Sequence, residues 1–71
     1  GTKMVIMKNV QNDIERSIVV EPLYGTFGTG DVKDVYMVVC NYGFGQINVF
    51  PFADAEEAYD TYLRMTGRKG R

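Results

Sequence analysis

Residues 46–52 alternate between polar and apolar side chains, which is the pattern of a strand with one buried face. Gln46 and Asn48 alternate with Ile47 and Val49, and two phenylalanines follow. From Asp54 onward the apolar positions recur at helical spacing instead. The pattern therefore predicts a strand that leads directly into a helix.

The predicted helix has recognisable signals at both ends. The carboxylate of Asp54 is expected to accept a hydrogen bond from the backbone amide of Glu57, and the Glu57 side chain is expected to reach back, as in a capping box. Gly67 is a typical C-terminal stop. The side chains predicted to share the buried stripe are Ala55, Ala58, Tyr59, Tyr62, Leu63 and Thr66.

Two further strands are predicted upstream. Residues 3–10 include an unbroken apolar run, which is typical of a central strand covered on both faces. Residues 32–40 are the clearest strand of the chain, with apolar side chains on both sides, and residues 41–43 are expected to turn tightly into the next strand.

Residues 14–24 fit two assignments. Ile18, Val19 and Val20 are β-branched and favour a strand, whereas the polar residues just before them are compatible with a helix entry. Pro22 counts against a regular helix. Both assignments stay open at this point. The glycines that follow, Gly25, Gly28 and Gly30, predict a loop; the Lys-Ser/Thr pair of a nucleotide-binding loop is absent.

Composition narrows the possible chemistry. The chain has 71 residues, of which 45% are hydrophobic and 24% charged, so we expect one globular domain over residues 3–71. It contains no histidine and a single cysteine, which excludes an internal disulfide, a Cys/His zinc site and a histidine base. Cys40 lies in an apolar run and is predicted to be buried. No cofactor is expected.

Charge predicts no strong attraction to nucleic acid by itself, because the formal net charge is −1. The acidic residues near the start of the helix are explained by a capped, solvated helix terminus, so we expect no enzymatic activity. The basic C-terminal end fits either phosphate contacts or a solvated tail. No apolar run is long enough for a membrane span and no signal peptide is visible, so an intracellular protein without membrane contact is expected.

Several stretches resemble the RNA recognition motif family. Residues 42–49 match the longer strand motif of that family at Gly43, Phe44 and Gly45, and conservatively at Ile47. Residues 5–10 are similar to its shorter motif, residues 23–28 look like the end of its first helix, and the opening of the predicted helix is similar to its second helix. The resemblance implies a ferredoxin-like α+β sandwich, an antiparallel sheet packed on helices, that binds single-stranded RNA, and it favours the nucleus.

The resemblance also implies a set of RNA-binding residues. Phe44 would stack on one base and Tyr42 or Tyr36 on a second, and Gln46 and Asn48 would bond base edges. The residues that would meet phosphates are Lys3, Lys8, Arg68, Lys69 and Arg71. Departures from the family weaken this set, because Gln46, Ile6 and Tyr42 stand where the family has two aromatic residues and a basic one. An alternative for Phe44 is packing over the glycines of its own hairpin.

Two alternatives complete the expectations. The sequence ends at Arg71 with little room for the fourth strand of the RNA recognition motif family. Either a further strand follows beyond Arg71 or the first strand is an open edge, and a protein partner at that edge or on the helix face is the second function considered. If residues 14–23 form a strand, the fold becomes a four-stranded antiparallel sheet with one C-terminal helix. That arrangement resembles the AP2-type DNA-binding domains, which share the Phe52-x-x-Ala-Glu-Glu-Ala pattern but have arginine-rich sheets.

Overall fold

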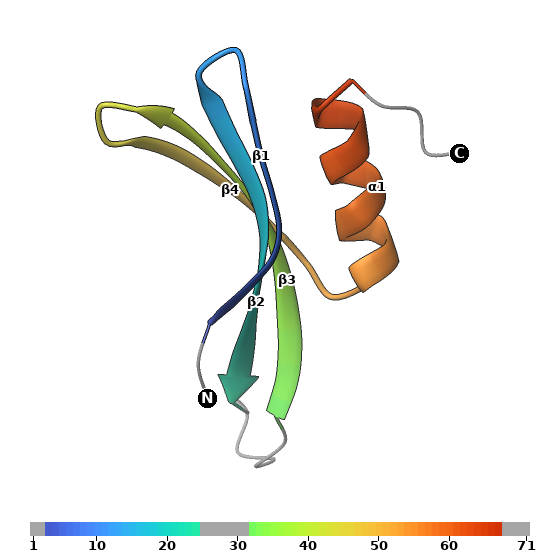
Figure 1. Cartoon of the computed structure of the whole chain (residues 1–71). Helices are drawn as coiled ribbons and strands as arrows, with labels where there is room; N and C mark the ends of the chain where they lie inside the picture. The colour runs from blue at the N-terminus through green and yellow to red at the C-terminus, as the bar shows by residue number, and fades with distance from the viewer. Residues whose placement is uncertain (1–2, 25–31, 68–71) are drawn as a thin grey trace.

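The computed structural model describes residues 3–24 and 32–67. Within them, four strands are followed by one helix (Figure 1). The elements are β1 (Met4–Gln11), β2 (Ile14–Tyr24), β3 (Val32–Gly43), β4 (Gln46–Phe52) and α1 (Ala55–Met65). The predicted strand–helix pair at the end of the chain is confirmed. The loop predicted at Gly25, Gly28 and Gly30 lies outside the described residues.

The strands form one antiparallel sheet in the order β1-β2-β3-β4. Both described hairpin turns have two central residues with positive φ, as a type I′ turn requires. Asn12 and Asp13 join β1 to β2, and Phe44 and Gly45 join β3 to β4. The turn predicted at residues 41–43 is therefore placed too early, because β3 continues to Gly43 and the turn lies at residues 44–45.

The observed fold is a four-stranded antiparallel sheet with one C-terminal helix, which is the alternative predicted from the sequence. The ferredoxin-like sandwich is not confirmed. Residues 14–24, left open above, form a strand that pairs with β3 along its whole length. Pro22 is tolerated because β1 ends its pairing at Val20, so β2 has a free edge beyond that point.

The apolar run of the first strand predicted a central strand, and this prediction is wrong. It lies at one edge of the sheet, paired only with β2, and Met4, Val5 and Ile6 are all exposed. Its register shifts between Val5 and Met7, which leaves Ile6 in a β-bulge. The unbroken apolar run of β1 therefore belongs to an edge strand with a bulge, and not to a strand that is covered on both faces.

Helix α1 begins after Asp54, whose Oδ1 accepts from the backbone N–H of Glu56 at 3.4 Å. The predicted cap residue is confirmed, but the amide it bonds is that of Glu56 and not Glu57. At the other end Gly67 has φ 80° and its N–H donates to the carbonyl of Arg64 at 3.1 Å. The predicted helix stop is therefore confirmed.

The core lies between the helix and one face of the sheet. Its buried members are Ile18, Val38, Ala58, Tyr62 and Leu63. Cys40 is buried as predicted, and its Sγ lies 3.6 Å from the Sδ of Met65. Ala55 and Tyr59, predicted for the buried stripe, are exposed because the stripe that meets the sheet is narrower than the sequence pattern.

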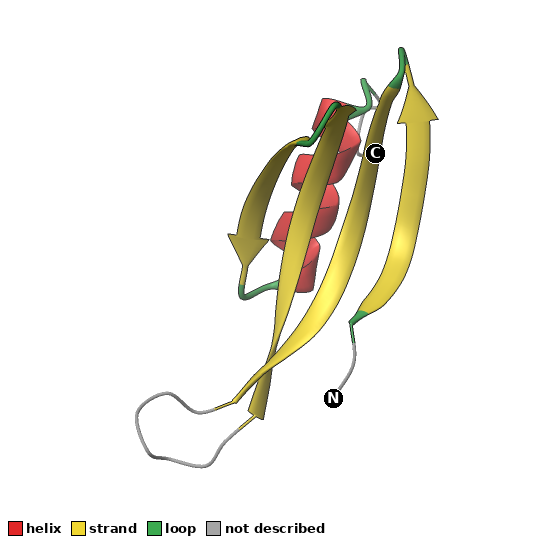
Figure 2. Cartoon of the chain, turned by 90° about the vertical axis from the view of Figure 1, so that its left-hand side faces the viewer, coloured by secondary structure: helices red, strands yellow, loops and turns green. Residues whose placement is uncertain are grey.

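Figure 2 looks onto the other face of the sheet, with the helix behind it. No described element covers this face. Across residues 3–24 and 32–67, no helix has the length and apolarity needed to cross a membrane.

Candidate functional site

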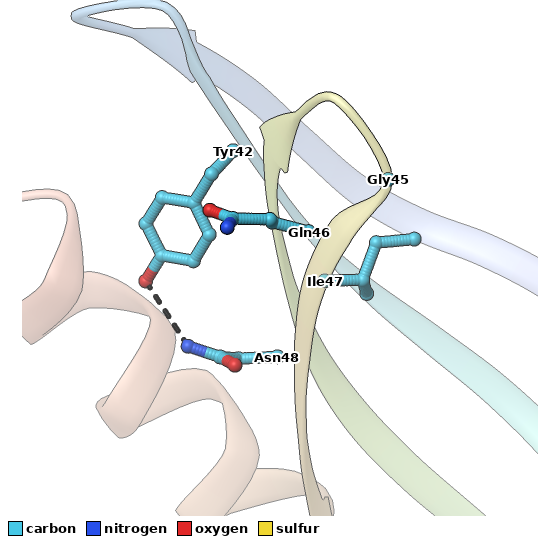
Figure 3. A pocket seen from close by; sticks show the side chains of 5 residues that line it. All are labelled: Tyr42, Gly45, Gln46, Ile47 and Asn48. Atoms are coloured by element: carbon cyan, nitrogen blue, oxygen red, sulfur yellow. Dashed lines mark hydrogen bonds between the residues drawn. The ribbon is translucent and has the colours of Figure 1, made fainter.

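The β3–β4 hairpin brings together three of the predicted RNA-binding residues. Tyr42, Gln46 and Asn48 line an open pocket with Gly45 and Ile47 (Figure 3). In that view Tyr42, Gln46 and Asn48 point toward the helix side of the sheet and Ile47 points away. The Asn48 Nδ2 donates to the Tyr42 hydroxyl at 3.5 Å, a long bond on the surface. These amide and hydroxyl groups are accessible to a ligand.

Phe44 occupies the tip of the same hairpin and is fully exposed. It does not pack over the neighbouring glycines, which was the alternative considered for it. Its φ is +56°, a region that bulky side chains rarely adopt and in which asparagine or glycine is preferred at this position of a type I′ turn. Neither packing nor backbone preference explains a phenylalanine at this position.

The predicted phosphate contacts do not join this group. Lys8 lies on β1, at the opposite edge of the sheet, and its Nζ forms an ion pair with Glu15 Oε2 at 3.4 Å. Arg68 and Lys69 lie outside the described residues. The two stretches that resemble RNA-recognition motifs lie on β1 and on the β3–β4 hairpin, and β2 lies between them. The aromatic platform implied by the resemblance is therefore not assembled from adjacent strands.

A second candidate surface, not predicted from the sequence, is the sheet face without the helix. We call it the open face. Because side chains alternate along a strand and Val38 points into the core, the strand register assigns the residues of this face. Its apolar members are Val5, Val10, Val19, Leu23, Val35, Met37, Val39, Ile47, Val49 and Pro51.

The centre of the open face is the most apolar part. Val5, Val19, Met37 and Pro51 are partners in register and form one row across all four strands. Val49, in the next row, remains 48% exposed. A signal for this surface was present in the sequence: the strands have apolar side chains on both sides, and only one narrow helix follows to cover them.

Charged side chains on the open face are few and balanced. Lys8 and Glu15 lie toward the β1–β2 turn, and Glu21 and Lys33 lie toward the other end of β2 and β3. Two cations and two carboxylates give this face no net charge. Arg16, the one arginine of the described strands, lies on the helix side opposite Cys40.

Both edges of the sheet have features that hinder the addition of another strand. On β1 the bulge at Ile6 interrupts the register, and on β4 Pro51 lacks a backbone N–H. Among the described residues, no three His, Cys, Asp or Glu side chains cluster in a way that would hold a metal ion.

Comparisons with known proteins found no matching family model, no similar curated protein and no similar solved structure. The candidate surfaces are therefore judged on their geometry and chemistry alone.

Proposed function

We propose that this chain is a protein-interaction domain that binds its partner through the open face. The observation that carries the proposal is a continuous apolar surface across all four strands, opposite the face that the helix covers. Exposed apolar surfaces that extend over several elements are characteristic of interaction sites, whereas single exposed apolar side chains are ordinary.

Charge favours a protein over a nucleic acid as the partner on this face. Binding to a phosphate backbone needs an excess of Lys and Arg, because affinity comes largely from the release of counterions. The open face has as many carboxylates as cations, and Lys8 is already paired with Glu15. The AP2-type domains bind DNA through sheets that are rich in arginine, which the open face lacks, so the resemblance to them does not support DNA binding by this face.

Site-specific photocrosslinking in cells tests the proposal. A photoreactive amino acid at Val49 probes the open face, and the same group at Val32 is the matched control. Val32 is 52% exposed against 48% for Val49, but by strand alternation it lies on the helix side of the sheet.

We expect a discrete protein adduct from position 49, identified by mass spectrometry, and none from position 32. Equal adducts at both positions, or none at either, would contradict an interaction site on the open face.

A second candidate, binding of single-stranded RNA, is supported by one observation: the fully exposed and strained Phe44 beside the accessible groups of Tyr42, Gln46 and Asn48. Unusual backbone conformations persist where they serve a function. In this reading Phe44 stacks on one base and the amides bond base edges, as the resemblance to the RNA recognition motif implies. A complete platform of that family is not part of this proposal, because β2 lies between β1 and the β3–β4 hairpin.

Titration of the labelled domain with a pool of short single-stranded RNAs, followed by NMR, tests the second candidate. Chemical shifts should change at Phe44, Gln46 and Asn48, and Phe44→Asn should weaken binding by ~1–3 kcal/mol, the typical worth of one stacked base. Asparagine suits positive φ, so this variant should fold at least as well as the parent. Tyr59→Ala removes an exposed aromatic from the helix and serves as the control. Unchanged spectra would contradict the hypothesis that this hairpin binds single-stranded RNA.

A further inference from the structure

We infer that the partner on the open face is a second copy of this chain, so that two sheets stack face to face with their helices outside. The inference rests on the proposed function and identifies the occupant of the same surface. Three properties of the chain point to it: an undersized core, a thin and extended shape, and an open face without net charge.

The first property is the core. Among the described residues, the buried apolar side chains are Ile18, Val38, Cys40, Ala58, Tyr62 and Leu63. Twelve large apolar side chains are exposed by comparison, five of them on the open face: Val5, Val10, Leu23, Ile47 and Val49. Domains of this size without a disulfide or a metal commonly complete their core by oligomerisation. A second sheet would cover the apolar side chains of the open face.

The second property is shape. The principal extents are 42 × 33 × 16 Å, and the radius of gyration is 13.3 Å. A compact domain of this length is expected to have a radius of gyration of about 11 Å. The molecule is thus a slab with one helix layer and one sheet layer. Stacking a second sheet about 10 Å away would give the aligned packing of a β-sandwich, with α1 on each outer face.

The area available is consistent with a dimer. Four strands paired over about seven residues cover roughly 400 Å² of flat sheet in each copy, from standard strand spacing and rise. Side chains that protrude from both sheets raise the accessible area above the flat area, which brings the pair to the ~1,000 Å² that a specific interface needs.

The third property is charge. Each end of the open face has one cation and one carboxylate, Lys8 with Glu15 and Lys33 with Glu21. In a face-to-face dimer the two-fold axis runs parallel to the sheets, either along the strands or across them. The first arrangement places each end of the open face on the same end of the other copy, and the second places it on the opposite end. In either arrangement no end brings a net charge against the other copy, and the apolar row through Val19 and Met37 meets itself. The bulge on β1 and Pro51 on β4 disfavour the alternative of joining edges.

Sedimentation equilibrium of the purified chain over a wide concentration range tests the inference. The parent should be a dimer that dissociates on dilution. Val49→Lys should raise the dissociation constant at least about tenfold, because an ammonium would lose its water in an apolar interface. Val5→Lys makes the same test from the opposite edge of the sheet. Val32→Lys, on the helix side at matched exposure, should leave the constant within about twofold of the parent.

The outcomes separate this inference from the proposed function. A chain that stays monomeric at every concentration overturns the second copy as occupant; photocrosslinks from Val49 to another protein would then still support the interaction domain. A monomer without such crosslinks overturns both. A dimer unaffected by Val49→Lys and Val5→Lys, with circular dichroism confirming that both variants fold, shows that the copies meet elsewhere and also overturns the inference.

Discussion

The two faces of the sheet are built from the same four strands, yet only one of them became the core. Ile18 and Val19 are neighbours in sequence on opposite faces; Ile18 is 2% exposed, whereas Val19 is only half-buried. Val38 is completely buried under the helix, whereas Val49 on the open face is half exposed. Apolar side chains alone therefore do not make a core; a covering layer does.

The helix decides the difference because its apolar stripe is short. Its buried apolar residues are Ala58, Tyr62 and Leu63, and they meet the helix-side residues of β2 and β3. One such stripe is enough for the middle of one face. The other face keeps its apolar row without cover from any described element, which is why we propose it as the interaction site.

The largest expected effect compares two isoleucines, one on each face. Ile18→Ala should lower the free energy of unfolding by about 2–5 kcal/mol, because it leaves a cavity in the core. Ile47→Ala, at a side chain that is 53% exposed on the open face, should change it by less than about 0.5 kcal/mol at concentrations where the chain is monomeric. Urea denaturation of the two variants measures both values. Equal losses would mean that the two faces do not differ as described.

A smaller effect is expected at the start of the covering helix. Asp54→Ala should destabilise the domain by ~1 kcal/mol, because the Glu56 amide loses its acceptor. Asp60→Ala removes an exposed helix carboxylate for which no capping bond is present in the described structure, and is the control. The midpoints of thermal unfolding report the difference. An unchanged midpoint for Asp54→Ala would mean that the cap does not hold the helix on the sheet.

The smallest effect concerns the ion pair on the open face. Lys8 and Glu15 are both well exposed, so Lys8→Ala should cost no more than about 0.5 kcal/mol in the monomer. The loss of stability should become smaller as salt is added, because salt screens the attraction between two exposed charges. Urea titrations at low and high salt check this. A loss above ~1 kcal/mol would indicate that the open face is more buried than its exposure implies.

Much of the local structure was predictable from the sequence. The strand at residues 46–52, the Asp54 cap, the stop at Gly67 and the burial of Cys40 follow from alternation, capping chemistry and hydrophobicity, which depend on neighbours in the chain. The candidate site was only partly predictable. Tyr42, Gln46 and Asn48 come together because they share one hairpin, whereas Lys8 was assigned to the same surface and lies on β1, at the opposite edge of the sheet.

What the sequence determined by itself is thus three of the four strands, the helix and the apolar character of both sides of the strands. Only the tertiary structure decided that residues 14–24 are a strand, that β1 is an edge, and which face the helix covers. The physical reason is that strand order and cover depend on contacts between residues far apart in the chain. Ile18 is compatible with a helix or a strand until Met7 and Val38 lie on either side of it.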